Sequence, residues 1–253
     1  MDGLKDKVVI LTGAAGGVGQ STAVKFAKEG VRLVLTDLQL PPLTDLKTRL
    51  IEYPSEIMAV QADISSEASV DSLIQKTLET YGRIDILVNN AGFSGSKKCL
   101  AEDYDMDMAR KVFDVNTLGT FYCMKKVLPI MRAQGSGVIV NTTSVAADRA
   151  TPYQAIYAAS KAAIVAMTKA IAWEYGSYGL RVIAIGPSAI DTPMIDAFAN
   201  GNVEEVKKQR AASNALGRIA RPEEIANLIV FLSSEEASFM TGVNVLIDGG
   251  NRK

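Results

Sequence analysis

Tyr157 and Lys161 lie four positions apart in the stretch YAASK, in a chain of 253 residues that contains no histidine. Such a chain lacks the one side chain whose unperturbed pKa suits proton transfer near neutral pH. The pair falls within a helical pattern at about 152–176, and a spacing of four places both side chains on one face of a helix. The ordinary interpretation is a packing pair whose amine reaches water. The alternative is a phenol that acts as acid and base.

The charge of a nearby lysine is enough to make this alternative workable. Lowering the pKa of a phenol from about 10 to about 7.5 requires about 3.4 kcal/mol. One ammonium about 5 Å away supplies about 3.3 kcal/mol at an effective dielectric constant of about 20. Lys161 is therefore expected to turn Tyr157 into a usable proton carrier.

Two further polar residues belong with this pair. Ser144 follows an apolar strand pattern and is expected at a strand's carboxyl end, where open α/β sheets bind ligands, although a serine there is more often a turn or N-cap residue. Asn116 lies in the centre of a helical pattern at about 104–132, where Asn is unfavourable and commonly bonds back to its own helix. At a helix distortion its side-chain amide could instead hold a water that connects a buried lysine to solvent.

The rest of the chain alternates strand and helix patterns that would position these residues. Seven short apolar runs predict strands, and helical periodicity lies between them, for example at 21–30, 69–82 and 222–234. Alternation of this kind predicts an α/β fold with one doubly wound parallel sheet in a single domain. The stretch at about 188–215 contains no strand pattern and is a candidate substrate lid. The predicted strands are 8–12, 32–36, 57–61, 84–88, 137–141, 181–185 and 243–247.

A glycine-rich turn, TGAAGGVG at 12–19, joins the first predicted strand to a helix. There the backbone can approach a pyrophosphate, whose charge the helix N-terminus stabilises. Asp37 closes the second strand, 18 residues after Gly19, where a carboxylate can accept hydrogen bonds from both ribose hydroxyls and repel a 2′-phosphate; it could also merely start a turn. Because Gly16, Leu38 and Gln39 supply no cation, we expect NAD and not NADP.

Two later strand ends complete the predicted nucleotide site. Asp63 could bind the adenine amino group or cap the helix that begins near Ser65. The small residues of NNAG (89–92) permit close approach of the backbone to the cofactor, although a plain turn would look similar. The predicted cofactor-binding residues are Gly13, Gly16, Gly17, Val18, Gly19, Asp37, Leu38, Asp63, Ile64, Asn90, Ala91, Gly92, Tyr157, Lys161, Pro187, Ile190 and Thr192.

Composition excludes several other classes of protein. The formal charge of −1 leaves no basic excess for nucleic acid. The sequence contains no run of about 18 apolar residues, the pattern that would predict a membrane span. The start of the chain lacks a signal-peptide pattern, so we expect a cytoplasmic protein. Two cysteines, Cys99 and Cys123, are too few for a disulfide framework or a zinc ribbon, and the absence of histidine removes ordinary zinc catalysis; no metal is predicted.

At this point the sequence resembles the short-chain dehydrogenase/reductase family along almost its whole length. TGAAGGVG, NNAG, Asn116, Ser144, YAASK and the terminal DGG (248–250) occur in the family's order and at its usual spacing. The resemblance implies a doubly wound seven-stranded sheet. It also implies that Ser144 polarises the substrate oxygen, Tyr157 is the acid and base, Lys161 lowers the Tyr157 pKa while holding the nicotinamide ribose, and Asn116 supports a proton relay.

The resemblance extends to assembly and to one departure from the family pattern. It implies self-association, commonly as a tetramer, through the helices at about 104–132 and 152–176 and the C-terminal helix and strand. In GPSAIDT (186–192) the Thr that binds the carboxamide in the family is present as Thr192, but Ser188 stands where most members have Gly. Ser188 either shapes the substrate pocket or is simply tolerated.

The expected function is NAD-dependent interconversion of a secondary alcohol and a ketone by hydride transfer, with Tyr157 exchanging the hydroxyl proton. One alternative is a 3-oxoacyl-thioester reductase that presents Lys207, Lys208 and Arg210 to a carrier protein, and another is a nucleotide-binding redox sensor without turnover. A mostly apolar pocket would suit a cyclic or aryl-substituted alcohol, whereas Ser94, Ser96 and Gln154 leave a polyol open. The expected pocket residues are Phe93, Ser94, Val145, Ala146, Tyr153, Gln154, Ser188, Ala189, Met194 and Phe198.

Overall fold

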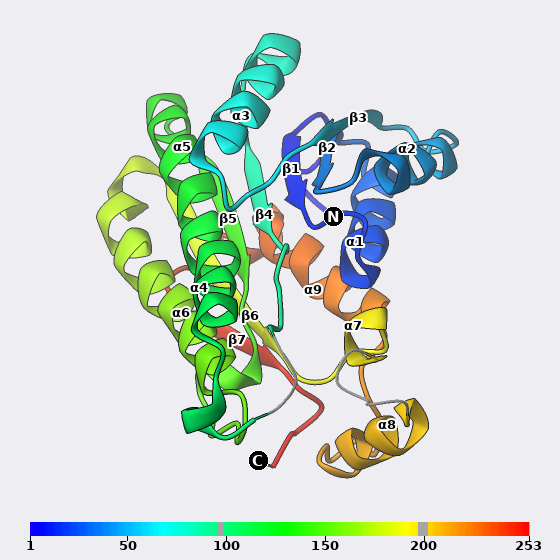
Figure 1. Cartoon of the computed structure of the whole chain (residues 1–253). Coiled ribbons are helices and arrows are strands. Elements are labelled where there is room, and N and C mark those ends of the chain that lie inside the picture. Colours follow the sequence, from blue (N-terminus) through cyan, green and yellow to red (C-terminus); the bar gives the residue numbers. More distant parts are fainter. Residues whose placement is uncertain (96–98, 197–201, 253) are drawn as a thin grey trace.

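Seven parallel strands form one sheet in the computed structural model, which describes residues 1–95, 99–196 and 202–252. Their spatial order is β3-β2-β1-β4-β5-β6-β7, so the winding direction reverses between β1 and β4 (Figure 1). This confirms the predicted doubly wound parallel sheet. The strands are β1 (Val8–Thr12), β2 (Arg32–Asp37), β3 (Glu56–Gln61), β4 (Ile86–Asn89), β5 (Gly137–Thr142), β6 (Leu180–Pro187) and β7 (Asn244–Ile247).

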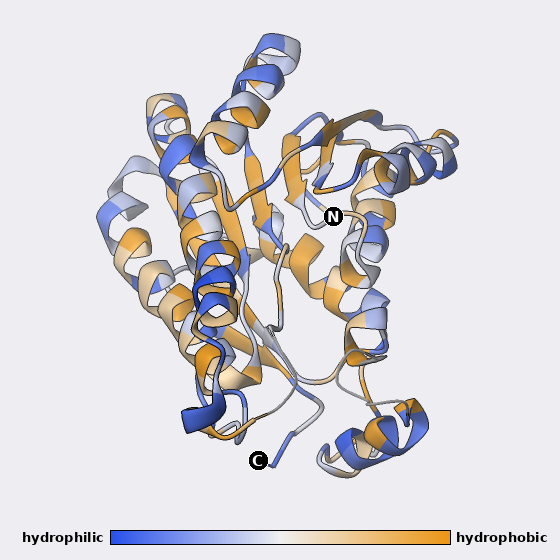
Figure 2. Ribbon diagram, in the orientation of Figure 1, coloured by the Kyte–Doolittle hydropathy of each residue, from blue (hydrophilic) through white to orange (hydrophobic). Residues whose placement is uncertain are grey.

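Helices cover both faces of the sheet. Alternate strand residues feed two apolar clusters: Val9 and Leu11 of β1 pack on one face, and Ile10 packs on the other. The central strands are mostly apolar in Figure 2 because both of their faces are buried, whereas the edge strands β3 and β7 are partly exposed. The first cluster includes α1 (Gly17–Lys28), α2 (Leu40–Arg49) and α9 (Pro222–Ser233), and the second includes α3 (Glu67–Tyr81), α5 (Thr120–Gln134) and α6 (Ala155–Tyr175).

One helix was missed by the sequence interpretation, and one was predicted with the correct irregularity. The missed helix is α2, which contains Pro41 and Pro42 in its first turn. Proline is tolerated there because its missing N–H would have no helical partner. The predicted helix at 104–132 consists of α4 (Met106–Phe113), a π-helical segment (Asp114–Gly119) and α5. Asn116 lies in that π-helical segment, so the expected distortion is present.

The reversal of winding places the carboxyl ends of β1, β4, β5 and β6 together at one edge of the sheet. Two short helices, α7 (Pro193–Asp196) and α8 (Val203–Ala212), follow β6 beside this edge (Figure 1). They account for the two helical patterns expected in the candidate lid at 188–215. Phe198, which lies within that stretch, and Ser96 are both outside the described residues.

The segment Ala155–Tyr178 is long and apolar enough to cross a membrane by length and composition alone, with a mean hydropathy of 1.3. It is weak support for a membrane span, since the core helix of a globular protein passes the same test. In this fold the helix packs along β6 and against α4, and Lys161 is buried in its first half.

Candidate active site

A cavity of about 770 Å³ opens at the reversal point, and all the predicted cofactor-binding residues line it. Of the four predicted catalytic residues, Ser144, Tyr157 and Lys161 also line it, whereas Asn116 is fully buried behind the wall. The structure therefore brings the glycine-rich turn (12–19) and the YAASK segment (157–161), which are more than a hundred positions apart in the chain, to one site.

The glycine-rich turn builds one wall of the cavity from backbone alone. Gly13 has a φ of +64°, and a Cβ there would lie 2.7 Å from the Ala91 Cα atom. A Cβ on Gly19 would overlap the Gly13 carbonyl oxygen, so the turn and the helix can pack this closely only with glycine at position 19. Helix α1 begins at Gly17 with no side-chain cap at Gly16, which leaves first-turn N–H groups for an anion.

Asp37 holds this turn while facing the cavity. Its Oδ2 accepts a hydrogen bond from the Ala15 N–H at 3.0 Å, and its Oδ1 accepts one from the Leu38 N–H at 2.8 Å. A carboxylate has about four acceptor sites, so these bonds leave capacity for ribose hydroxyls. The cations that line the cavity are Lys111, Lys161 and Arg210, and none belongs to the segments around Asp37. The turn-forming and ribose-binding interpretations of Asp37 are thus compatible.

Asn90 and Thr12 join the glycine-rich turn to the end of β4. The Asn90 side-chain amide donates to the Thr12 and Gly13 carbonyl oxygens at 3.1 and 3.0 Å. The Thr12 hydroxyl accepts from the N–H groups of Asn90 and Ala91, both at 3.0 Å. The side chain of Asn90 therefore shapes the cofactor wall, and Thr12 is a supporting residue that the sequence interpretation missed.

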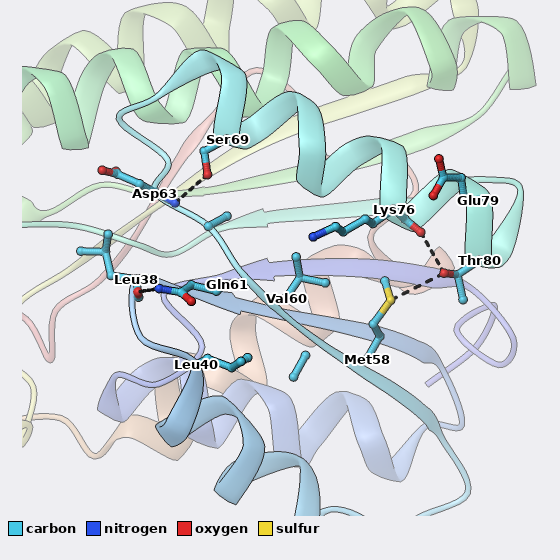
Figure 3. A pocket seen from close by; sticks show the side chains of 12 residues that line it. Leu38, Leu40, Met58, Val60, Gln61, Asp63, Ser69, Lys76, Glu79 and Thr80 are labelled. Atoms are coloured by element: carbon cyan, nitrogen blue, oxygen red, sulfur yellow. Dashed lines mark hydrogen bonds between the residues drawn. The ribbon is translucent and has the colours of Figure 1, made fainter.

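Asp63 lies where the main cavity meets a second, more open cavity of about 680 Å³ beside the edge strand β3 (Figure 3). Its Oδ1 accepts from the Ser65 N–H and hydroxyl at 2.9 and 2.6 Å, and its own N–H donates to the Ser69 hydroxyl. The residue that caps α3 is Ser66, so Asp63 orders the turn before the cap. Its Oδ2 takes no part in these bonds, which suits the predicted adenine contact.

Lys161 is a buried cation without an acidic partner among the described residues. It is 3% exposed, and its Nζ donates to the Thr142 carbonyl oxygen at 2.9 Å. A Cβ on Gly92 would lie 3.2 Å from that Nζ, which places the ammonium at the NNAG segment. Burial lowers the pKa of Lys161 to about 8, so it is still mostly charged at neutral pH.

Tyr157 lies beside this lysine, with the Lys161 Nζ 5.9 Å from the centre of its ring. Burial raises the pKa of Tyr157 above its usual value near 10, and a hydrogen-bond interaction with Ser144 opposes that rise. Without cofactor, burial of the phenol therefore outweighs the contacts that favour the phenolate. That Lys161, together with the positive nicotinamide ring of the oxidised cofactor, lowers the Tyr157 pKa stays a prediction for the cofactor complex.

Asn116 fastens three elements together instead of facing the cavity. Its Oδ1 accepts from the Phe93 N–H at 2.7 Å, and its Nδ2 donates to the Phe93 carbonyl at 2.9 Å and to the Ser160 hydroxyl at 3.0 Å. Both amide protons and one acceptor site are used by protein partners. One acceptor site of Oδ1 is left over from these bonds, so the water assigned to Asn116 stays a prediction.

Ser188 has a structural partner. Its hydroxyl donates to the Asp248 carbonyl oxygen at 3.2 Å, which links the end of β6 to the DGG segment, while the residue still lines the cavity. Of the expected pocket residues, Phe93, Val145, Ala146, Gln154, Ser188, Ala189 and Met194 line the cavity. Ser94 and Tyr153 are not among the lining residues. Lining residues that were not expected include Lys111, Val115, Thr151, Pro193, Ile195 and Arg210.

The donor set fits a dinucleotide and no metal. Free N–H groups at α1, carboxylates at Asp37 and Asp63, and small residues at the β4 end lie in sequence along one cavity. Within the described ranges, no group of three Cys, Asp or Glu side chains is placed to hold a metal ion.

Comparison with known proteins agrees with this geometry. A family model described as "Enoyl-(Acyl carrier protein) reductase" matches residues 13–252. Levodione reductase of Leifsonia aquatica is 39% identical over 97% of this chain and 94% of its own length. The 3-oxoacyl-[acyl-carrier-protein] reductase of Thermotoga maritima is 36% identical over 98% of both chains.

Solved structures match as closely. The crystal structure of levodione reductase superposes with a TM-score of 0.94 at 38% identity, covering 97% of both chains. That of NAD⁺-bound xylitol dehydrogenase gives a TM-score of 0.92 at 31% identity and covers 98% of this chain and 100% of its own. The chain is an NAD-dependent oxidoreductase that interconverts a secondary alcohol and a ketone by hydride transfer. It belongs to the short-chain dehydrogenase/reductase family, as its motifs indicated.

Proposed function

We propose that Tyr157 exchanges the substrate's hydroxyl proton, Ser144 holds and polarises the substrate oxygen, and Lys161 supplies the positive charge that favours the phenolate. The observation that carries this assignment is that all three side chains line one end of the cavity, with Lys161 buried and largely charged. In oxidation the proton passes from the substrate hydroxyl to the Tyr157 oxygen as the hydride leaves the same carbon. In reduction both transfers run in reverse.

The residues at the other end would hold the cofactor. The N–H groups of α1 and the glycine-rich turn face the pyrophosphate, Asp37 takes the ribose hydroxyls, and Thr192 lies against Gly17 at the nicotinamide side. Bound NAD supplies the hydride acceptor and, when oxidised, a positive ring charge. That charge is the missing contribution that would bring down the Tyr157 pKa, because Lys161 alone does not offset burial.

Asn116 is a positioning residue in this proposal. It fixes Phe93, which lines the cavity, and Ser160, which precedes Lys161 on α6.

The proposed substrate is a compact secondary alcohol or ketone with apolar surface, such as a cyclic or aryl-substituted one. The walls around the reacting end are mostly apolar or small, and the described parts of the lid at 188–215 contribute to them. The apolar lining residues there are Phe93, Val115, Val145, Ala146, Ala189, Met194 and Ile195.

A 3-oxoacyl-thioester reductase is the second candidate, because a relative with that name is 36% identical. One observation weighs against it: of the three cations expected to face a carrier protein, Lys207 pairs internally with Asp191 at 2.7 Å. Asp37 would repel the 2′-phosphate of NADP and so weighs only against an NADP-dependent enzyme of this kind, because a similar 3-ketoacyl-(acyl-carrier-protein) reductase was crystallised with NADH. A redox sensor without turnover has no need of an activated phenol, so it ranks third.

The test is a panel of cyclic, aryl and polyol secondary alcohols and a 3-hydroxyacyl thioester, each with NAD and with NADP, followed by the absorbance of the reduced nicotinamide. Turnover with NAD on a compact alcohol, lost in Tyr157→Phe, is the expected result. Turnover confined to NADP and the thioester would replace the first candidate with the second. Tight NAD binding without turnover on any alcohol would favour the sensor.

Self-association and a cytoplasmic location complete the proposal. Apolar side chains are exposed on the outer helices, at Leu118 and Phe121 near the start of α5 and at Trp173 on α6, which is 90% exposed. Leu246 on the edge strand β7 is exposed as well. These positions match the helices and strand through which the resemblance implies a tetramer. Light scattering at micromolar concentration is expected to give a tetramer, and a monomer would overturn this part.

A further inference from the structure

The charges around the cavity are divided between its two ends. The acidic side chains Asp37 and Asp63 lie at the adenosine end, whereas the cations Lys111, Lys161 and Arg210 come from segments around the reacting end. The proposed chemistry uses only Lys161. Two cations at this end are therefore unexplained by hydride and proton transfer.

Arg210 reaches the cavity from the inner face of α8. Val203, Val206, Lys207 and Arg210 are partly buried, at the three- and four-residue spacing of one helical face. The residues between them, Glu204, Glu205, Lys208 and Gln209, are exposed. The helix thus presents one cation to the cavity and another, Lys208, to solvent.

Two acids that adjoin cavity-lining residues already have cationic partners. Asp191 binds Lys207 at 2.7 Å, and Asp248 binds Arg149 at 2.8 Å. Within the described ranges, no acid lies at ion-pair distance from the Arg210 guanidinium. A partly buried guanidinium without a carboxylate is well suited to accept an anionic oxygen from a ligand, because its fork geometry matches carboxylate and phosphate.

Lys111 supplies a second positive charge from α4, across the strand ends from α8 (Figure 1). Its Nζ lies over the Phe93 ring, 5.4 Å from the ring centre, and Phe93 lines the cavity. Among the described residues no acid pairs with Lys111 either. Lys111 is exposed, so it would act on an anionic ligand group through long-range attraction, whereas the partly buried Arg210 could contact the group directly.

We propose that the substrate carries an anionic group, a carboxylate or phosphate, in addition to the reacting alcohol or ketone, and that Arg210 binds this group with Lys111 adding long-range attraction. The inference rests on the proposed function of the cavity and names the substrate class more closely. The cofactor pyrophosphate has the same chemistry, but the N-terminus of α1 and the glycine-rich turn already provide its partners. The anionic group that Arg210 binds therefore belongs to the substrate.

The test compares 3-hydroxycyclohexanecarboxylate with its neutral carboxamide at saturating NAD, in the wild type, Arg210→Gln, Arg210→Lys and the control Lys208→Gln. The wild type is expected to prefer the carboxylate by about 10-fold or more in kcat/KM. Arg210→Gln should raise KM for the carboxylate by about 10-fold and leave kcat within about 2-fold of the wild type. Its kcat/KM for the carboxamide should also stay within about 2-fold. Arg210→Lys should restore part of the lost affinity for the carboxylate. Lys208→Gln should match the wild type.

The other outcomes separate the possible failures. An equal loss of kcat/KM for the carboxylate and the carboxamide in Arg210→Gln would show that Arg210 has a structural role, and it would overturn the inference. A raised Kd for NAD, measured by fluorescence titration with unchanged substrate preference, would assign Arg210 to the cofactor pyrophosphate and also overturn it. Turnover of the carboxamide without preference for the carboxylate would leave the proposed function standing and remove only the anionic group. No turnover on either compound or on the wider alcohol panel would reject the proposed function itself.

Discussion

The two ends of the cavity are built in different ways. At the adenosine end, Asp37 is the last residue of β2, and Asp63 follows the end of β3. Hydrogen bonds from backbone N–H groups already orient both carboxylates. At the reacting end, Ser144, Tyr157 and Lys161 come from a loop and a helix, and burial raises the pKa of Tyr157 and lowers that of Lys161.

This difference teaches where each end obtains its selectivity. The adenosine end is organised before any ligand arrives, so it should discriminate between cofactors by charge and geometry. The reacting end holds a phenol and an ammonium in an environment that opposes ionisation of both. Its chemistry should therefore depend on the charge that the cofactor brings.

The largest expected effect is at the reacting end. Tyr157→Phe removes the group that is proposed to carry the proton, and general acid–base catalysis of this kind contributes about 10²–10⁴-fold. We expect kcat to fall by about that factor, with little loss of NAD affinity, because Tyr157 is one of many cavity-lining residues and Phe keeps its ring. Steady-state kinetics and a cofactor titration measure both quantities, and near-normal turnover would remove Tyr157 from the mechanism.

Lys161→Met tests the buried charge. An ammonium about 6 Å away at a dielectric constant of about 20 contributes about 3 kcal/mol, so kcat should fall by about 100-fold. Stability should change in the opposite direction. Because the Lys161 pKa is about 8 in the folded chain and 10.5 ordinarily, the unfolded chain binds more protons between those values.

The wild type should consequently gain stability as the pH rises from about 8 to about 10.5, while the penalty of the buried charge is complete below pH 8. Lys161→Met should be the more stable protein at about pH 7, by up to about 3 kcal/mol. Urea denaturation of both proteins across this range measures the difference. A gap that widens with pH would contradict the burial argument.

The adenosine end gives a smaller effect. Asp37→Asn keeps one acceptor oxygen and most of the shape but removes the charge that repels a 2′-phosphate. The ratio of kcat/KM for NAD to that for NADP should fall by about 10-fold or more. Asp45→Asn, an exposed change on α2, is the control and should leave the ratio unchanged. An unaltered ratio in Asp37→Asn would show that geometry, and not charge, selects NAD.

Ser188→Gly should have the smallest effect. It restores the residue that most members of the family carry and removes one hydrogen bond, at 3.2 Å, to the Asp248 carbonyl. We expect a loss of about 1 kcal/mol or less in stability, and kcat/KM within about 3-fold. A larger change in substrate preference would show that the Ser188 hydroxyl contacts substrate and would extend the reacting end to the end of β6.

The sequence predicted the fold and the cavity lining because both follow from local patterns. Apolar strand runs and a glycine-rich turn are local signals, and Asp37 could be assigned by its place at a strand end. The direction of the Tyr157 pKa shift could not be predicted from the sequence, since it depends on burial by segments that are distant in the chain. Asn116 was placed at a helix distortion correctly, but its partners Phe93 and Ser160 are set by tertiary packing. Arg210 gave no motif signal as a cavity residue.

The most direct test of the account is an ultraviolet difference titration of the Tyr157 phenol, obtained by subtracting the spectrum of Tyr157→Phe, with and without saturating NAD⁺. The account predicts an apparent pKa above 10 in the free chain and a value lower by at least about one unit in the NAD⁺ complex. An equally high pKa in the complex would contradict the claim that cofactor charge completes the acid–base pair.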